Sequence, residues 1–404
     1  MLYKHFTEKL LGLQDLIITN VEENEKHIFI YAEIKRKTHN CISCGTATNT
    51  IHDYRTQNIK DIPAFGKLVT VVLRKRRYRC ESCQKRFYEN NTFLGKYCRT
   101  TSRLSAYIIN KLSDERSFTS VAKEVNLSVS TVIRIFDIVS YPKCQLPEVL
   151  SIDEFKGNAD GEKYLGILTD PKNCVVLDIL PKRKMRDLYA YFKEFPREER
   201  DKVKYFVSDM WKTYFDVSTV WLKNATHIVD KYHWIRQVIW SFESVRKEEQ
   251  KKLGKDLRVY FKRSRSLLIK PFDKLNDEQK RQVNVMLYYS ANLSRAYWYK
   301  ESFLKTLHSG DRETARKEMR EWIFDAEESE LVQFVKCANT MRNWFSGILN
   351  SFDVPYTNGF TEGCNNKIKV LKRNAYGYQN FKRFRNRILH IFYYKKTAQK
   401  QAAI

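Results

Sequence analysis

Three acidic residues, Asp153, Asp209 and Glu362, lie in segments that are otherwise apolar or basic. Asp153 and Asp209 each stand at the end of a strand-like apolar run, in VLSIDEF and KYFVSDMW. Glu362 is the only acid after Pro355, in a stretch that carries eleven Lys and Arg residues. Two strand-borne aspartates and a helical glutamate can together hold a pair of divalent metals at a phosphodiester.

The basic surroundings strengthen this interpretation. A carboxylate is unusual where phosphate is expected, because it repels the ligand unless a cation lies between them. For any one of the three acids alone, a solvated or ion-paired residue is the simpler interpretation. Considered together, the three contexts favour a metal-dependent site.

The composition indicates a polyanionic partner. The chain has 404 residues and a formal net charge of +26 that is spread along its length, which points first to nucleic acid. Its hydrophobic content of 43% is enough to bury cores, and about two to four domains are expected at this length. No apolar run approaches the roughly 18 residues of a membrane span, and the N-terminus lacks a signal-peptide layout. We therefore expect an intracellular protein with no membrane partner.

Nine cysteines include two pairs with Cys-x-x-Cys spacing, Cys41/Cys44 and Cys80/Cys83. In a reducing compartment this spacing indicates metal ligands rather than disulfides, and zinc takes four thiolates in a tetrahedron. Residues 1–92, which also contain strand-like runs, are therefore expected to form a β domain with one structural zinc. A coincidental pair of thiol turns or a redox site is the alternative. Two other candidates are not expected to be ligands, His52 and Cys98.

Residues 93–147 are expected to form a helix-turn-helix domain around FTSVAKEVNLSVSTVIRIF. Apolar residues fall where two crossed helices bury them, and Asn126 can adopt the left-handed conformation of the turn. Ser128 is placed to cap the second helix. Ser130, Thr131 and Arg134 are then exposed on that helix and are candidates for DNA contacts. An ordinary helical hairpin is the alternative, and the basic chain around the motif disfavours it.

From residue 148 to residue 250 the pattern is α/β. Three strand-like runs precede a helix, a fourth strand, a second helix and a short fifth strand. This order matches an RNase H-like sheet, in which the first and fourth strands are adjacent, so Asp153 and Asp209 are expected side by side. Strand alternation sends Glu154 to the face opposite Asp153, and Asp170 belongs to a turn.

Residues 251–350 show helical apolar spacing and no convincing strand, which predicts an all-α insertion that splits the core. Its aromatic residues are expected mainly in a core rather than on a base-stacking surface: Tyr288, Tyr289, Tyr297, Trp298, Trp322 and Trp344. Residues 351–404 complete the core with the helix that bears Glu362 and a basic closing helix. The expected fold is thus an RNase H-like α/β core with an all-α insertion, preceded by a zinc-binding β domain and a helix-turn-helix.

The segment TNGFTEGCNNKIKVLKRNAYGYQNFKRFRNR resembles the C-terminal signature of bacterial insertion-sequence DDE transposases of the ISL-three type. The resemblance covers nearly the whole chain, through the zinc-binding head, the helix-turn-helix and the motifs SIDEFKG, VSDMW and DKYHW. The C-terminal motif is the most specific of these. The cysteine pairs depart from the usual form, because Ile42 and Glu81 replace a proline after the first Cys.

The resemblance implies roles for the charged residues. Asp153, Asp209 and Glu362 would be the DDE triad of an RNase H-like transposase, each a ligand for Mg²⁺. Lys369 follows Glu362 by seven residues, as in the family, which is about two helical turns, so it can meet a DNA phosphate. Lys372 and Arg373 on the same basic helix are further expected DNA contacts.

Asp230 and His233 match a D-x-x-H signature that recurs in DDE enzymes with helical insertions. His233 is therefore a candidate catalytic residue, which would position the scissile phosphate or hydrogen-bond a metal ligand. A satisfied structural histidine is the alternative.

The implied function is transposition by phosphoryl transfer with two Mg²⁺ or Mn²⁺ ions per active site. The protein would bind the terminal inverted repeats, cleave the element's ends and join the 3′-OH to target DNA. Joining two ends requires at least a homodimer, or a larger synaptic complex, on double-stranded DNA, in the bacterial cytoplasm at the nucleoid. A resolvase or nuclease of the same fold would share the triad, and a non-catalytic regulator would explain only residues 1–145. Strand transfer to a second duplex distinguishes the three.

Overall fold

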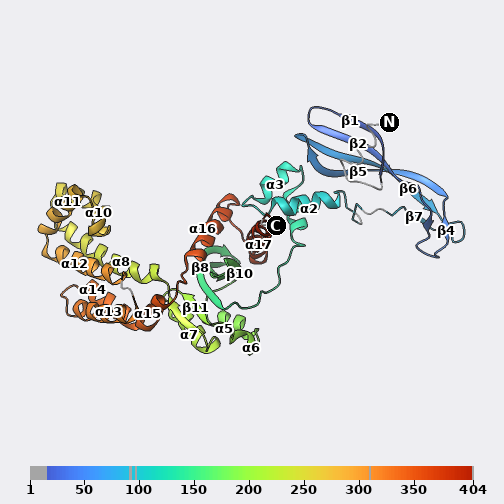
Figure 1. Ribbon diagram of the computed structural model, residues 1–404. Helices are drawn as coiled ribbons and strands as arrows, with labels where there is room; N and C mark the ends of the chain where they lie inside the picture. The colour runs from blue at the N-terminus through green and yellow to red at the C-terminus, as the bar shows by residue number, and fades with distance from the viewer. Residues whose placement is uncertain (1–15, 91–92, 96–97, 309–310, 403–404) are drawn as a thin grey trace. The chain divides into compact units, whose positions relative to one another are not determined.

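The structure, a computed structural model, describes residues 16–90, 93–95, 98–308 and 311–402 (Figure 1). The chain divides into two compact units: residues 1–141, 370–378 and 382–404 in the first, and residues 142–369 and 379–381 in the second. In the described parts of the chain, no helix has the length and apolar character needed to span a membrane.

The first unit contains a five-stranded sheet with the order β1-β2-β6-β5, in which β7 also pairs with β6. Its strands are β1 (Leu16–Glu23), β2 (His27–Ile34), β5 (Ile51–Ala64), β6 (Lys67–Arg79) and β7 (Arg86–Tyr88). The long β5–β6 hairpin turns at Phe65 and Gly66, whose φ angles of 52° and 76° suit a tight two-residue hairpin turn. A short ladder of β3 (His39–Asn40) and β4 (Ala47–Thr48) flanks the first cysteine pair. This region is the β domain that the sequence predicted.

The described part of the first unit also contains the helices α2 (Ser102–Lys111), α3 (Phe118–Glu124), α4 (Val129–Phe136) and α17 (Phe381–Ala402). The fully buried Arg387 of α17 donates hydrogen bonds to the carbonyl oxygens of Asp114, at 3.0 Å, and Arg116, at 2.8 Å. His390 of α17 also hydrogen-bonds the carbonyl of Ile109 at 2.8 Å. The closing helix therefore packs with the helix-turn-helix, whereas the sequence analysis grouped it with the catalytic core.

The second unit is built on a five-stranded sheet with the order β10-β9-β8-β11-β12. Its strands are β8 (Val149–Ala159), β9 (Glu162–Asp170), β10 (Val175–Leu180), β11 (Tyr205–Ser208) and β12 (Thr226–Val229). The first and fourth strands, β8 and β11, are adjacent and parallel, as expected of an RNase H-like sheet. Asp153 lies within β8 rather than at its end, and the register of the two strands places it beside Asp209, which directly follows β11.

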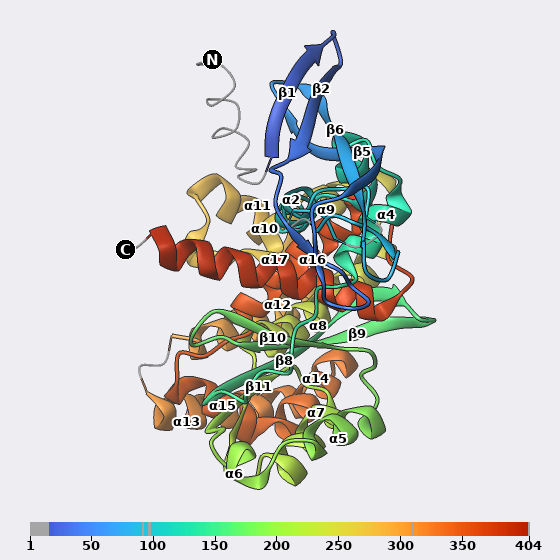
Figure 2. The same ribbon diagram turned by 90° about the vertical axis from the view of Figure 1, so that its right-hand side faces the viewer.

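Helices cover the two faces of this sheet in a pattern set by strand alternation. Leu150 and Ile152 of β8 pack with α5 (Met185–Lys193) and α7 (Lys212–Trp221), which lie together with α6 (Arg197–Arg200) on one side in Figure 2. Ser151 and Asp153 alternate with them and hydrogen-bond residues of α16 (Gly359–Asn374) and of the turn before it. Asp153 therefore lies on the face that meets the helix bearing Glu362.

Helices follow β12, and Figure 1 shows them in yellow to orange beyond the sheet. They start before residue 251, where the insertion was expected to begin, because the preceding helix shares its hydrophobic core with the later ones. The helices are α8 (Lys231–Lys251), α9 (Lys255–Arg263), α10 (Arg265–Ile269), α11 (Asp277–Tyr288), α12 (Ala291–Thr306), α13 (Arg312–Glu327), α14 (Val332–Asn343) and α15 (Phe345–Asp353). Gly347 lets α15 approach β12, because a Cβ there would lie 2.8 Å from a methyl group of Val229.

The aromatic residues of the insertion do not all enter its core. Tyr297 and Trp322 are buried as predicted. The prediction was wrong for Tyr288, Tyr289 and Trp298, which are 89%, 51% and 55% exposed. Spacing along an amphipathic helix does not distinguish a core aromatic from one at the edge of the apolar stripe, and packing decides between them.

Candidate active site

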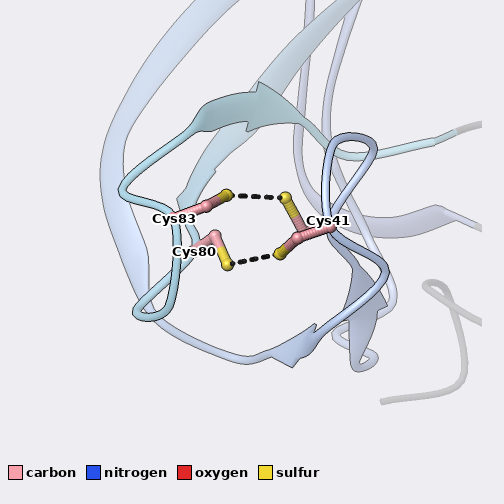
Figure 3. Close-up of side chains that lie close together, drawn as sticks. Cys41, Cys80 and Cys83 are labelled. Atoms are coloured by element: carbon pink, nitrogen blue, oxygen red, sulfur yellow. Dashed lines mark hydrogen bonds between the residues drawn. The ribbon is translucent and has the colours of Figure 1, made fainter.

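The four cysteines of the two pairs come together in the first unit. Figure 3 shows the thiols of Cys41 and Cys83 facing one another, with the sulfur atoms 3.5 Å apart. The sulfurs of Cys44 and Cys80 are also 3.5 Å apart. The four sulfur atoms all lie within 4.8 Å of one another, and among the described residues this group does not include His52 or Cys98.

Each cysteine pair forms a knuckle-like turn. The N–H of Gly45 donates to the carbonyl of Cys41 at 2.9 Å, and the N–H of Gln84 donates to that of Cys80 at 3.0 Å. Gly45 and Gln84 have φ angles of 76° and 62°, so both turns close through a left-handed residue. Hydrogen bonding with Thr46 lowers the pKa of Cys44 to about 6, which favours the thiolate that binds metal. Four convergent sulfurs fit a structural zinc.

The helix-turn-helix has the geometry that its sequence indicated. Asn126 adopts a φ of 50° in the turn, and Ser128 caps α4 by accepting the N–H of Thr131 at 3.2 Å. Ser130 and Arg134 are exposed on α4. Thr131 is only half-exposed, and its hydroxyl lies 2.8 Å from that of Ser128, so part of its hydrogen-bonding capacity serves the cap.

Asp153 lies on β8, buried against α16. Its Oδ2 accepts a hydrogen bond from Nδ2 of Asn365 at 2.9 Å, and its Oδ1 accepts the N–H of Glu154 at 2.7 Å. Burial raises the pKa of Asp153 to about 7, and the negative charges of Asp209, Glu154 and Glu362 add to the rise. Near neutral pH the carboxyl therefore ionises fully only when a cation or further donors offset this cost.

Asp209 follows β11 directly, and the register of β11 with β8 pairs Val207 with Ser151. Burial raises the pKa of Asp209 to about 6, and the charge of Glu154 adds to the rise. The Oδ1 atom of Asp209 is buried and has no hydrogen-bond partner in the structure. A buried anionic oxygen without a donor is costly, and a bound cation would remove that cost.

Glu362 lies in the first turn of α16 and is exposed. Its negative charge adds to the rise in the pKa of Asp153 and offsets part of the lowering of the pKa of His233, so it lies within electrostatic range of both. The three carboxylates form a looser group than the cysteines, which are the one set of His, Cys, Asp and Glu within 4.8 Å among the described residues. The oxygen donors nevertheless fit a hard divalent cation, because Asp209 Oδ1 and Asn365 Oδ1 are both buried without a donor.

Glu154 occupies the other face of β8, as alternation predicted. Arg183 binds its Oε1, and the hydroxyl of Tyr214 on α7 donates to its Oε2 at 3.2 Å. Asp170 is the last residue of β9 and pairs with Val175 of β10, so the prediction that it belongs to a turn was wrong. Its Oδ1 accepts the N–H of Asn173 at 3.0 Å. Protein groups thus already bind the carboxylates of Glu154 and Asp170, whereas Oδ1 of Asp209 has no such partner and could bind a metal ion.

The start of α16 is held to the sheet by polar contacts. The hydroxyl of Ser151 donates to the side-chain oxygen of Asn358 and lies 3.0 Å from the hydroxyl of Thr361, which in turn is 2.7 Å from that of Thr169. These groups are all buried. A hydrogen-bonded polar cluster of this kind holds the start of α16 in one position on the sheet. Because Glu362 lies in the same helical turn, its position is held as well.

Asp230 and His233 occupy the start of α8. Asp230 accepts the N–H of Asn358 on its Oδ1 at 2.9 Å, which ties α8 to the residue before α16. Arg236 donates from Nη2 to Nδ1 of His233 at 3.3 Å, because a guanidinium has only donors. Burial and the charge of Arg236 lower the pKa of His233, so its ring is neutral at pH 7 and carries its proton on Nε2.

The basic residues predicted on α16 are accessible to different degrees. Lys369 and Arg373 are exposed, whereas Lys372 is half-buried. Lys369 donates to the side-chain oxygen of Asn366 at 3.2 Å. The sequence reasoning missed Asn365, the hydrogen-bond partner of Asp153. Its place three residues after Glu362, one helical turn away, is a signal that could have identified it.

Comparison with known proteins adds to this geometry. A transposase profile of the ISL3 type matches residues 150–388. A zinc-finger profile of the transposases of IS204, IS1001, IS1096 and IS1165 matches residues 37–83. The helix-turn-helix domain of transposase family ISL3 matches residues 89–137.

Two curated proteins are similar over very different lengths. The transposase for insertion sequence element IS1001 from Bordetella parapertussis is 29% identical over 395 residues, which is 94% of this chain and 96% of that protein. An ATP-dependent protease from Lactococcus lactis subsp. lactis is 46% identical over 50 residues, which is 12% of this chain and 16% of the protease. The first similarity extends over the whole architecture, and the second is local.

Proposed function

Because the chain belongs to the ISL3 family of DDE transposases, we propose that it cleaves the ends of an insertion sequence and joins the freed 3′-OH to target DNA. Asp153, Asp209 and Glu362 are the proposed triad. The observation that carries this proposal is the pair of adjacent parallel strands β8 and β11, which present Asp153 and Asp209 beside the helix of Glu362. The pKa values of both aspartates are raised, as expected for carboxyl groups buried together without a cation to compensate their charge.

Divalent metal fits this donor set. Asp153, Asp209 and Glu362 would hold Mg²⁺ or Mn²⁺ ions, two in each active site. Bound there, the metal would neutralise charge on the phosphodiester and favour ionisation of the attacking hydroxyl. In the first unit, Cys41, Cys44, Cys80 and Cys83 would hold one structural zinc.

The chain's own residues then bind and orient the DNA strand. His233 has its Nε2–H available to donate to a phosphate oxygen, since Arg236 occupies its Nδ1. Asn365 orients the carboxylate of Asp153 through the 2.9 Å hydrogen bond. Lys369, Lys372 and Arg373 present positive charge on α16 to the phosphate backbone, which contributes affinity but no base selectivity.

The head of the chain supplies recognition of the element's ends. Ser130, Thr131 and Arg134 on α4 are the proposed base-reading residues, with the zinc-binding β domain as a further DNA contact. Two ends must be held at once for joining, so a dimer or larger synaptic complex is the proposed active assembly.

A strand-transfer assay tests the function. Binding selection from random DNA first identifies the end sequence, and a labelled end oligonucleotide is then incubated with plasmid DNA and Mg²⁺. The expected result is covalent joining of the oligonucleotide's 3′-OH to the plasmid by the wild type and none by Asp153→Asn. Cleavage of the end without joining would identify a nuclease, and end binding without either would identify a regulator.

A further inference from the structure

Tyr232, Arg236 and Trp240 on α8 form a ladder beside the carboxylates, in which two exposed rings flank a half-buried arginine. Tyr232 and Trp240 are 51% and 52% exposed, and Arg236 lies between them in sequence at helical spacing. The guanidinium carbon of Arg236 lies 5.1 Å from the ring centroid of Tyr232 and 4.4 Å from that of Trp240. Both rings stack on the guanidinium and leave about half of their surface exposed to solvent. Packing of the hydrophobic core does not account for this arrangement.

The ladder begins at the proposed active site. Arg236 donates to His233 at 3.3 Å, and the ring of Tyr232 lies edge-on to that of His233 at 5.7 Å. The positive charge of Arg236 offsets part of the rise that burial causes in the pKa values of Asp209 and Asp230, and it adds to the lowering of the pKa of His233. Its guanidinium therefore lies within electrostatic range of these groups. Trp240 follows His233 by seven residues, about 10 Å along the helix axis.

Arg236 also has unused hydrogen-bonding capacity. Its Nε is shielded from solvent and has no hydrogen-bond partner, its Nη2 donates to His233, and within the described residues the guanidinium forms no ion pair with a carboxylate. An incoming phosphate would therefore be bound by the remaining Nη donors. A guanidinium placed near acidic groups without a bidentate partner of its own is ready for an anion that arrives from outside. Phosphate matches the donor fork of Arg, and nucleobases match the exposed rings.

We propose that Tyr232, Arg236 and Trp240 form a track for the unpaired DNA strand next to the cleaved bond. The rings of Tyr232 and Trp240 stack on bases, and Arg236 binds a phosphate of the same strand. This inference deepens the proposed function and rests on it for the place of the cleaved bond. The binding step is independent of chemistry, and its test therefore needs no catalysis.

The experiment compares two probes in Ca²⁺ by fluorescence anisotropy with the full-length protein. One probe is a blunt duplex, and the other is the same duplex with a 3′ oligothymidine overhang. The wild type is expected to prefer the overhang, and Trp240→Ala is expected to lose about fivefold to one-hundredfold of that preference. Its affinity for the blunt duplex should be unchanged. Arg236→Gln should reduce the salt dependence of overhang binding by about one phosphate contact.

Trp298→Ala is the matched control, because Trp298 on α12 is 55% exposed and no cation stacks on it among the described residues. It should keep the full overhang preference. The proposal is overturned if Trp240→Ala behaves like this control, if the wild type shows no preference, or if both probes weaken equally. A change in self-association in place of strand preference would assign the rings to an interface between copies and would also overturn it.

The outcomes for the function and for the track are separable. Asp153→Asn should keep the overhang preference, since binding precedes the reaction. If Asp153→Asn still cleaved and joined DNA, the proposed triad would be wrong. The measured preference for the overhang probe would still support the proposed track. If instead the triad variants were inactive and Trp240→Ala kept its preference, only the track would fail.

Discussion

Nδ2 of Asn365 donates to Oδ2 of Asp153 at 2.9 Å, although the two residues are 212 positions apart in the sequence. Asn365 follows Glu362 by three residues on α16, so a single helical turn carries the proposed third acid and a partner of the first. A hydrogen bond to the ionised carboxylate favours that form. Asn365 is thus a positioning residue, which acts through Asp153.

Replacing Asn365 with Ala should reduce end cleavage about tenfold to one-hundredfold, as for other partners of metal-binding carboxylates. Loss of the donor should also raise the pKa of Asp153 further, so the acidic limb of the pH–rate profile moves to higher pH. Single-turnover cleavage across the pH range measures both effects. Asn366→Ala is the control, because Asn366 is exposed and contacts Lys369. An unchanged profile in Asn365→Ala would show that the hydrogen bond has no part in the reaction.

Glu362→Gln should abolish end cleavage and strand transfer in Mg²⁺ while end binding in Ca²⁺ persists. The substitution keeps the side-chain shape and removes one metal-binding charge. Because its surroundings are basic, DNA affinity should stay constant or increase slightly. If Glu362→Gln kept more than about a tenth of wild-type cleavage, the third ligand would lie elsewhere in the chain.

The contribution of Asp153 and Asp209 to the stability of the metal-free protein should fall as the pH rises from about 4 to about 7. The folded pKa values of about 7 for Asp153 and about 6 for Asp209 lie above the value of about 3.9 in an unfolded chain. In this window these two carboxyls hold more protons in the folded state than in the unfolded state, so their contribution to stability decreases with pH. Buried His227, whose pKa is lowered to about 4, acts with the opposite sign, and comparison of Asp153→Asn with the wild type isolates the carboxyl contribution. Asp153→Asn should be about 1–3 kcal/mol more stable than wild type at about pH 8 and nearly equal at about pH 4.

The same melts test the metal site without any measurement of activity. Mg²⁺ should raise the melting temperature of the wild type at neutral pH, because it binds only the folded carboxylates. The increase should be absent or much smaller in Asp153→Asn. An equal increase in both proteins would place the responsible Mg²⁺ site away from Asp153.

Purified protein should contain about one equivalent of zinc, and Cys80→Ser should lose it together with stability of the β domain. Metal analysis and thermal melting measure the two effects. Cys98→Ser is the control, since Cys98 is an exposed thiol outside the group of four. Less than about half an equivalent of zinc, unchanged by Cys80→Ser, would contradict the site.

Arg134→Ala should weaken binding to the element's end by about 1–3 kcal/mol relative to unrelated DNA. Arg134 is exposed on α4 and has no capping role, in contrast to Thr131. Competition binding with end and unrelated duplexes measures the difference. An equal loss for both duplexes would make α4 a phosphate-binding surface.

Local patterns in the sequence were sufficient to predict several features of the fold and of the metal-binding cysteines. The spacing of Cys41, Cys44, Cys80 and Cys83 predicted the sulfur cluster, because two turns of this kind present four thiols to one point. Ser128 and Asn126 predicted the cap and the turn of the helix-turn-helix. The order of strands and helices predicted that β8 and β11 are neighbours, since few topologies accommodate that order.

Contacts between distant segments were decided by the tertiary structure. The hydrogen bond from Asn365 to Asp153 and that from the N–H of Asn358 to Asp230 each join residues more than a hundred positions apart. The sequence specified which residue types stand on which face of each helix and strand, because the helix and strand periods are properties of the backbone. The packing of side chains from separate elements decides which of those faces meet and which aromatic residues remain exposed. The periodicity of one segment cannot predict this packing, because it depends on residues far away in the sequence.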